Sequence, residues 1–445
     1  MGTVIMIAQL ILALAILVSL HEWGHYIAAR SFGIRVEKFF IFFDAWGIKL
    51  FSKKVNDTEW GIGWLPLGGY VKIAGMIDES LDKEQLKTEP KEDEFRGKPA
   101  WQRLIVMLGG VTVNFVLGIL IFSMMLFYFG DKYLPNSAVV DGNGIMVTEI
   151  GAQTGLQSGD RITKVNGNEV LKFRDLRDPA YLLADELNYE VLRDGETLNI
   201  PIDDSIRKQL LESKGQPLFE YRFSPYVGQV VKKSNAHQAG LKVKDRITAV
   251  AGTEIQFFDE LKPILQEHKE KSVAMQIDRD GETINLDVMV DSNGTIGFRP
   301  TDQMDYLDQQ DTVYYNFFAS FPEGTKRGIN TLAIQIKAFG QMFSGKIDPT
   351  KSVMGPIQMT KLFGAVWDWE RFWQITGLLS LILAFMNLLP IPALDGGHVL
   401  FLLVEMAIGR ALPEKFMYVM QVIGMIILFG LMAFIFGVDI LSFFK

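Results

Sequence analysis

Two histidines and a glutamate stand close together near the start of the sequence. His21, Glu22 and His25 form the pattern His-Glu-x-x-His. On a helix, residues four apart share a face, so both imidazoles can reach one ion while Glu22 lies beside them. Zinc with three protein ligands keeps a position open for water, whose pKa then falls towards about 7. Glu22 can take a proton from that water and later deliver it to a leaving amine. The pattern therefore predicts a hydrolytic zinc site.

The composition restricts which side chains can complete such a site. The 445-residue chain has no cysteine, so disulfides and thiolate metal sites are excluded. A transition metal must be held by His, Asp or Glu. The five histidines are His21, His25, His237, His268 and His398. The net charge of -8, without a basic block, gives no reason to expect a nucleic-acid partner.

A third ligand is expected from the segment 387–398, which interrupts an apolar stretch near the C-terminus. Pro390 and Pro392 cannot sustain a regular helix, and the glycine pair that follows lets the backbone turn freely. Irregular backbone at membrane depth is tolerated where it lines a cavity or is packed in protein. Asp395 is an ionisable group held at this point. On chemistry alone, His398 is a competing ligand.

Four apolar stretches are each near the 20 or so residues that cross a bilayer. They cover about residues 4–29, 101–129, 372–389 and 416–435. The mean hydropathy of +0.17, together with 22% charged residues, indicates membrane spans joined to soluble parts. The first stretch has no Lys or Arg before Arg30, so we interpret it as a permanent span and not as a cleaved signal peptide.

The orientation of the spans follows from the basic residues. Lysines and arginines are concentrated just after the first span and beside the second. The positive-inside rule then puts residues 30–100 in the cytoplasm. Residues 131–370 and both termini are expected on the outer side.

The region between the second and third spans contains an internal repeat. The pattern in Gly155–Thr163 recurs in Gly240–Thr248, and that of Arg193–Thr197 recurs in Arg279–Thr283. Two matched blocks at nearly equal offset imply two copies of one domain. Short alternating runs and Asp-Gly hairpin signals predict strands, with a helical run between them. Each copy is therefore expected to be a small α+β module.

Taken together, the motif at residues 21–25 and the segment 387–397 resemble the site-2 protease family of intramembrane zinc metalloproteases. The match is closest to the bacterial regulator of sigma-E protease type, which has two PDZ domains between its second and third spans. The repeats around Ala152–Ile162 and Ala236–Ile247 resemble bacterial, circularly permuted PDZ domains. PDZ domains commonly bind peptides by strand addition, and the alternative here is a steric plug without a specific ligand.

The resemblance assigns roles to individual residues. It implies that His21, His25 and Asp395 bind zinc and that Glu22 is the catalytic acid and base, which favours Asp395 over His398.

Other residues are implied to bind substrate. Asn387 is expected to help hold the substrate backbone in an extended form. The segment Trp64–Val71, with Gly68, Gly69 and Tyr70, resembles the family's membrane-associated β-loop, whose free edge can pair with an unwound substrate strand. A plain cytoplasmic hairpin is the alternative.

One position departs from the family pattern. The family usually has Gly-Pro shortly before an asparagine in the second span. Here Val111 takes the proline position, while Asn114 is retained.

The expected fold is a multi-pass α-helical membrane protein with four transmembrane helices and two extracytoplasmic α+β PDZ-like domains inserted between the second and third helices. The expected parts are a first transmembrane helix with HExxH (1–30), a cytoplasmic segment with the β-loop (31–99), a second helix (100–130), two PDZ-like domains (131–220 and 221–300), a linker with amphipathic helices (301–371), a third helix with the LDG motif (372–398) and a cytoplasmic loop with a fourth helix (399–445).

The function implied is that of a zinc endopeptidase cutting single-pass membrane proteins in or near their transmembrane segments. Regulated proteolysis is expected, such as cleavage of an anti-sigma factor in an envelope stress response, with removal of signal-peptide remnants as a further task. The PDZ pair would exclude bulky substrates, so another protease would trim them first. The resemblance implies a bacterial inner membrane. The alternatives are a non-catalytic PDZ scaffold with a structural metal and a metal-handling transporter.

Overall fold

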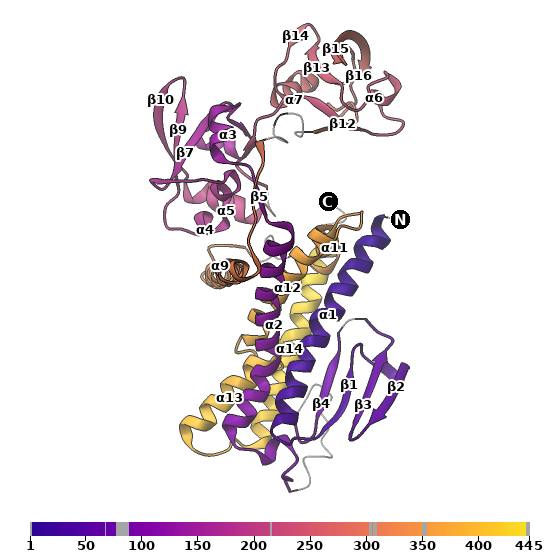
Figure 1. The fold of residues 1–445 in the computed structure, drawn as a ribbon, viewed down its shortest axis with the longest axis vertical. Coiled ribbons are helices and arrows are strands. Elements are labelled where there is room, and N and C mark those ends of the chain that lie inside the picture. Colours follow the sequence, from indigo (N-terminus) through magenta and orange to yellow (C-terminus); the bar gives the residue numbers. More distant parts are fainter. Residues whose placement is uncertain are drawn as a thin grey trace. The chain divides into compact units, whose positions relative to one another are not determined.

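The computed structural model describes residues 2–66, 68–76, 89–213, 216–301, 305, 309–348 and 354–441. It divides into two compact units, which are described separately. The helical unit comprises residues 1–130, 314–343 and 353–445, and the module unit comprises residues 131–313 and 344–352 (Figure 1).

Four helices of the helical unit are long and apolar enough to cross a membrane, counting the described residues only. They are α1 (Gly2–Ser31), α2 (Ala100–Phe129), α12 (Trp369–Leu388) and α14 (Glu414–Leu441). The four spans expected from the sequence coincide with these helices. Both α1 and α12 pack along α2, so α2 is the central helix of the site described below (Figure 1).

The described residues of this unit also form three α-helices that are shorter or more polar, besides two short 3-10 helices at Ala45–Gly47 and Phe95–Gly97. The three α-helices are α9 (Phe317–Phe343), α11 (Pro356–Phe363) and α13 (Asp395–Ile408). The expected third span, residues 372–398, is divided in the structure. Helix α12 ends at Leu388, and α13 begins at Asp395 and continues into the segment that was expected to be a loop. The carboxylate of Asp439, near the end of α14, accepts a hydrogen bond of 2.7 Å from the backbone N–H of Ile357 in the first turn of α11.

The helix α9 packs on α2 through small residues. A side chain at Gly324 would lie 2.2 Å from Ser123 Oγ, and one at Gly328 would lie 3.0 Å from Ile119. Farther along α9, the Phe339 ring contacts Phe385 of α12, with ring centroids 5.1 Å apart. Other apolar side chains of α9, such as Ile336 and Phe343, remain exposed.

A small sheet adjoins α1 in the same unit. Its strands are β1 (Val36–Phe40), β2 (Lys49–Val55), β3 (Thr58–Gly63) and β4 (Tyr70–Ile73), in the order β2-β3-β1-β4. The pair β1–β3 is parallel and the other pairs are antiparallel. Among the described strands, β4 is an outer strand of this sheet.

The module unit contains two modules whose six strands follow one another in the same scheme, while their helices differ in number and position. The first has α3 (Asn136–Asp141), β6 (Ile145–Val147), β7 (Arg161–Val165), β8 (Asn168–Glu169), α4 (Pro179–Leu182), β9 (Asn188–Arg193), β10 (Glu196–Pro201), α5 (Asp204–Glu212) and β11 (Phe219–Tyr221). The second has β12 (Tyr226–Val230), α6 (Asn235–Gln238), β13 (Arg246–Val250), β14 (Thr253–Glu254), α7 (Phe258–Glu267), β15 (Ser272–Arg279), β16 (Glu282–Met289) and β17 (Phe298–Thr301).

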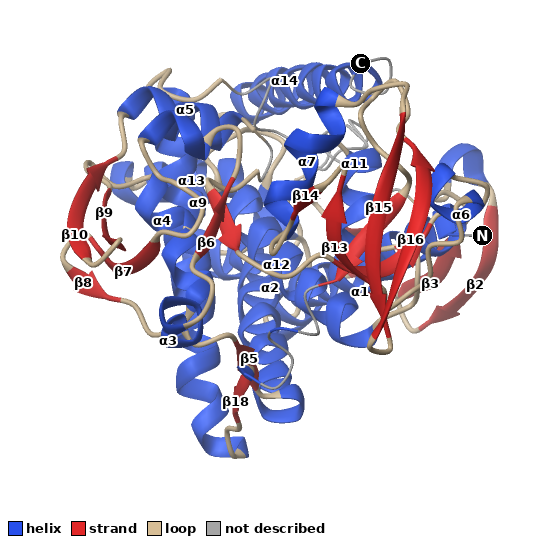
Figure 2. Ribbon diagram, turned by 90° about the horizontal axis from the view of Figure 1, so that it is seen from above, coloured by secondary structure: helices blue, strands red, loops and turns tan. Residues whose placement is uncertain are grey.

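The sheets of the two modules follow one scheme. Strand order is β10-β9-β7-β8 in the first module, with a separate pair β11-β6. In the second module the equivalent strands join in one sheet of order β16-β15-β13-β12-β17, with β14 beside β13. Figure 2 shows β13, β15 and β16 side by side. The repeat seen in the sequence is therefore a repeat of structure.

The repeated residues are those that make the same ion pair in each module. Arg193 binds the buried carboxylate of Asp160 at 2.6 and 2.7 Å and also the carbonyl of Gly155. Arg279 binds Asp245 at 2.7 Å through two nitrogens and also the carbonyl of Gly240. The hydrogen bond to the aspartate raises the pKa of each arginine above its ordinary value. These bonds explain why the two sequence blocks recur together.

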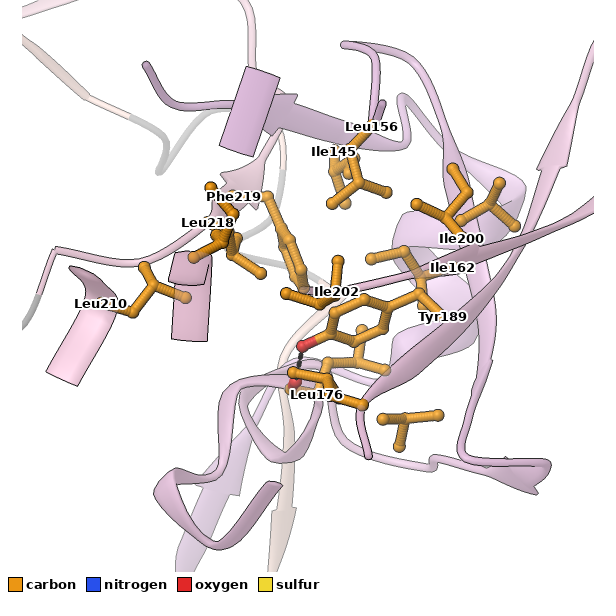
Figure 3. Packing of buried hydrophobic residues seen from close by; sticks show 14 of the residues in the cluster. Ile145, Leu156, Ile162, Leu176, Tyr189, Ile200, Ile202, Leu210, Leu218 and Phe219 are labelled. Atoms are coloured by element: carbon orange, nitrogen blue, oxygen red, sulfur yellow. Dashed lines mark hydrogen bonds between the residues drawn. The ribbon is translucent and has the colours of Figure 1, made fainter. Parts of the chain in front are cut away.

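Each module has its own apolar core. In the first module, Tyr189 is packed among Ile162, Ile202 and Phe219, and its hydroxyl donates a 2.9 Å hydrogen bond to the Leu176 carbonyl (Figure 3). Burial of the phenol raises the pKa of Tyr189 well above its ordinary value. A buried hydroxyl that finds an acceptor avoids the cost of an unpaired polar group.

The segment 131–313 of the module unit begins and ends in one two-stranded ribbon. Strand β5 (Asp131–Tyr133) pairs antiparallel with β18 (Asp311–Val313). The buried carboxylate of Asp131 binds Lys172 at 2.5 Å and Arg174 at 2.6 Å, which fixes the entering strand to the first module.

We expect replacement of Asp245 by alanine to destabilise the second module by about 3 kcal/mol, because Arg279 loses its fully buried carboxylate partner. Amide hydrogen exchange of the full-length protein should show lower protection in β13 and β15. Asp160→Ala should do the same for β7 and β9 only, and Asp287→Ala, at an exposed position of β16, should change little. Equal protection in the Asp245 variant and the wild type would contradict this role for the ion pair.

Candidate metal centre and active-site cavity

Three ligand atoms converge where α1 meets the start of α13. His21 and His25 lie one helical turn apart on α1, and only 7% and 4% of their surfaces are exposed. Asp395 Oδ2 is 3.1 Å from His21 Nε2 and 3.3 Å from His25 Nε2, and the two Nε2 atoms are 3.2 Å apart. Among the described residues, these three form the group of His, Asp or Glu side chains that can hold a metal ion.

The spacing of these atoms fits a tetrahedral zinc site. With zinc bonds of about 2.0–2.2 Å, neighbouring ligand atoms of a tetrahedron lie about 3.3 Å apart. The observed separations of 3.1, 3.2 and 3.3 Å match this value. Two imidazole nitrogens and a carboxylate oxygen are also a donor set that zinc accepts.

The approach of α2 to α1 depends on glycine. A side chain at Gly24 would lie 2.4 Å from the Gly109 carbonyl oxygen, and one at Gly109 would lie 2.6 Å from the Gly24 carbonyl oxygen. At Gly110 an added Cβ would lie 2.4 Å from His25 Nε2 and 2.6 Å from His21 Cε1. The two helices therefore touch backbone to backbone beside the imidazoles.

Both histidine rings are held at the nitrogen that faces away from the cluster. His25 Nδ1 is 2.8 Å from the Val106 carbonyl oxygen, which can only accept a hydrogen bond. His25 therefore carries its proton on Nδ1 and presents the lone pair of Nε2 to the metal site. His21 Nδ1 lies 3.3 Å from the side-chain amide of Asn114 on α2.

A sharp break between α12 and α13 places Asp395 at the cluster. Leu389, which precedes the first proline, has extended backbone angles, and α12 ends at Leu388. Side chains at Gly396 and Gly397 would lie 2.3 Å from the Leu388 carbonyl oxygen and 2.5 Å from the Ile391 carbonyl oxygen. The glycine pair thus lets α13 start directly against the end of α12, with Asp395 as its first residue. The break expected from the prolines is confirmed.

A cavity of about 590 Å³ lies at the cluster. Glu22, Asn114 and Asn387 line it together with the three converging side chains, and the strand residues Gly69 to Ile73 form another part of its wall. The edge strand β4 and the candidate metal centre therefore border one space.

The residues expected to bind substrate occupy different places. Asn387 Nδ2 is 3.2 Å from His21 Nε2, so its side chain reaches the candidate metal centre directly. Gly69 and Tyr70 line the cavity, whereas Gly68 lies against the Phe43 ring.

The segment Trp64–Val71, expected to form the β-loop, is part strand and part irregular in its described residues. Tyr70 and Val71 belong to β4, Leu65 forms an isolated bridge with Phe43, and the Trp64 indole donates to the Ala45 carbonyl at 3.0 Å. Pro66 cannot donate to a strand pair, which accounts for the irregular backbone before β4.

The cavity also contains polar residues that sequence reasoning missed. Asp44 accepts a 2.9 Å hydrogen bond from the Tyr70 hydroxyl and lies 3.4 Å from Lys38 Nζ, and all three line the cavity. Gln421 of α14 lines it as well, together with His398. Lys38 and Asp44 gave no sequence signal, because single charges in a cytoplasmic segment are common. A glutamine within an apolar span was the one available signal for Gln421.

Comparison with known proteins gives one consistent result. The sequence profile of peptidase family M50 matches residues 9–431. The regulator of sigma E protease of Haemophilus influenzae is 27% identical, with 96% of this chain and 97% of the relative covered. The regulator of sigma-E protease RseP of Escherichia coli K12 is 28% identical, with 96% and 97% covered. A protein of Neisseria meningitidis whose name describes a zinc metalloprotease is 27% identical, with 97% of both chains covered.

We expect Gly110→Ala to abolish metal binding, because its Cβ would occupy the space of the two imidazoles. Bound zinc per purified full-length protein, determined by elemental analysis, measures this. Gly430→Ala on α14 is the matched control, since an added Cβ there meets nothing within 4 Å. Full zinc occupancy in the Gly110 variant would show that the helices are not as close as described.

Proposed function

Because this chain belongs to peptidase family M50 and is a zinc metalloprotease of the site-2 type, we propose that it hydrolyses peptide bonds in or beside the transmembrane segments of single-pass membrane proteins. The observation that carries this proposal is the convergence of His21, His25 and Asp395 on a cavity that Glu22 also lines. These side chains lie on or next to helices apolar enough to cross a membrane.

In this proposal His21, His25 and Asp395 hold the zinc ion. When bound, zinc supplies Lewis-acid polarisation of the scissile carbonyl and makes a water molecule more acidic. Glu22 accepts the proton of the attacking water and transfers it to the amine that leaves when the C–N bond breaks. A structural metal needs neither an adjacent base nor an open position, so Glu22 argues against the scaffold alternative.

The outer strand β4 is the proposed place for the substrate backbone. A transmembrane helix keeps its carbonyls in internal hydrogen bonds, so it must unwind before a protease can reach them. Pairing with an edge strand replaces some of the bonds that are lost. Gly69 and Tyr70 line the same cavity as Glu22, and the amide of Asn387 lies in the cluster where it can bind an extended backbone.

The two modules are proposed to be PDZ-like domains that exclude bulky substrates. Supporting this are the repeated α+β order and the outer strand β17 of the second sheet, which a peptide can extend. We place both modules and both termini outside the cytoplasm, in agreement with the distribution of basic residues.

The relatives' names support a cellular role. Two relatives are named regulator of sigma E protease, which fits regulated proteolysis of an anti-sigma factor in a bacterial inner membrane. If the modules exclude substrates with bulky outer domains, another protease must first remove those domains. The metal-handling transporter has no comparable support.

We expect Glu22→Gln to lower the cleavage rate of a single-pass membrane reporter by at least about 10²- to 10⁴-fold, because the amide cannot accept the proton. Zinc content should stay at the wild-type level, since Glu22 is not one of the three converging ligands. Asp395→Asn is the contrasting variant and should lose both zinc and cleavage. Equal cleavage by wild type and Glu22→Gln would refute the proposed mechanism.

Removing the modules tests the size filter. Replacement of residues 134–310 by a two-residue Asn-Gly turn keeps the paired strands β5 and β18 as a hairpin and should allow cleavage of reporters that still carry a folded outer domain. A trimmed reporter should be cut at a similar rate by both proteins, which controls for damage to the site. Unchanged rejection of the bulky reporter would count against the filter.

A further inference from the structure

We infer that Asn114 is a positioning residue for the metal centre and that its side-chain oxygen accepts a hydrogen bond from Nδ1–H of His21. This inference rests on the zinc site proposed above. It concerns the ring of His21, whereas the proposed function concerns the chemistry in the cavity.

The geometry places Asn114 at the far side of the His21 ring from the cluster. Its side-chain amide contacts His21 Nδ1 at 3.3 Å, while His21 Nε2 faces Asp395 and His25. Only 1% of Asn114 is exposed, so bulk water does not compete for this contact. The Ser380 hydroxyl of α12 donates a 2.7 Å hydrogen bond to the backbone carbonyl of Asn114 and does not contact its side-chain amide.

The tautomer of His21 decides which amide atom faces the ring. A neutral imidazole carries one proton, on either Nδ1 or Nε2. If Asn114 donated an N–H to Nδ1, the proton would lie on Nε2 and block it as a ligand. Metal binding through Nε2 requires Nδ1–H, which needs an acceptor. Turning the amide by 180° exchanges Oδ1 and Nδ2 without moving the side chain, and so supplies that acceptor.

The resulting arrangement matches that of the other histidine. His25 Nδ1 faces the Val106 carbonyl at 2.8 Å, also on α2. Each imidazole would thus donate one hydrogen bond to an oxygen of α2 and present the other nitrogen to the metal. Oxygen atoms that accept a hydrogen bond from a metal-binding histidine fix the orientation of its ring and raise its basicity as a ligand. The central helix would therefore orient both ligands that α1 provides.

Two substitutions separate an acceptor from a donor at this position. Asn114→Leu keeps the size but removes the acceptor, and it should lower zinc affinity by about 10- to 100-fold. Asn114→Asp keeps an acceptor and cannot donate when ionised, so it should retain zinc affinity at or above the wild-type level. Zinc affinity of the full-length protein is measured by competition with a chelator, and the unfolding temperature of the zinc-free protein reports on packing.

The controls make each outcome decisive. Ser380→Ala removes the bond to the Asn114 backbone and leaves its side chain in place, so zinc affinity should be unchanged. A fall in affinity of tenfold or more in Asn114→Asp would overturn the inference, because an acceptor alone would then be insufficient. Wild-type affinity in Asn114→Leu would overturn it as well. If Asn114→Leu does not fold, Asn114→Asp still decides. Absence of zinc from the wild-type protein would instead refute the proposed metal centre itself.

Discussion

The close contact between α1 and α2 is the constraint on which the site depends. Gly24 and Gly109 place the two backbones against each other, and Gly110 leaves room for the imidazoles of His21 and His25. In a membrane, helix association relies on close packing, interhelical hydrogen bonds and lipid entropy, because lipid tails are as apolar as the helix surfaces. Glycines at this crossing therefore serve both the packing of the helices and the shape of the site.

Contacts between the helices also limit the free-energy cost of placing polar groups among apolar helices. Charged and polar side chains at membrane depth are expensive unless they pair with each other or line a cavity. Here the Val106 carbonyl bonds to His25, Asn387 contacts His21, and Ser380 bonds to the backbone of Asn114. Each of these contacts joins two different helices. The polar groups thus tie the bundle together at the level where the chemistry is proposed to occur.

The break between α12 and α13 has a comparable double role. It ends one helix early and starts the next with Asp395 beside the histidines. The fourth span supports this loop closely, since a side chain at Gly424 would lie 1.9 Å from the Pro392 carbonyl oxygen. Gln421, one turn earlier on α14, lines the cavity. All four long helices therefore contribute to the site or to its support.

The sequence by itself determined the features that depend on local periodicity and composition. Apolar length predicted the spans, the four-residue spacing placed His21 and His25 on one helix face, and the prolines predicted the break before Asp395. The repeated blocks predicted two similar modules, although the Asp–Arg ion pair that unites each block appears only in the fold.

Which atoms meet depends on the tertiary structure. Asp395 and His398 lie on the same short helix, and the packing of α13 against α2 and α12 brings the carboxylate, and not the imidazole, beside His21 and His25. Asp44 meets Lys38 and Tyr70 for a similar reason, because the pairing of β1 with β4 sets that contact. Contacts between residues tens to hundreds of positions apart depend on how whole elements pack, and local sequence patterns do not record that packing.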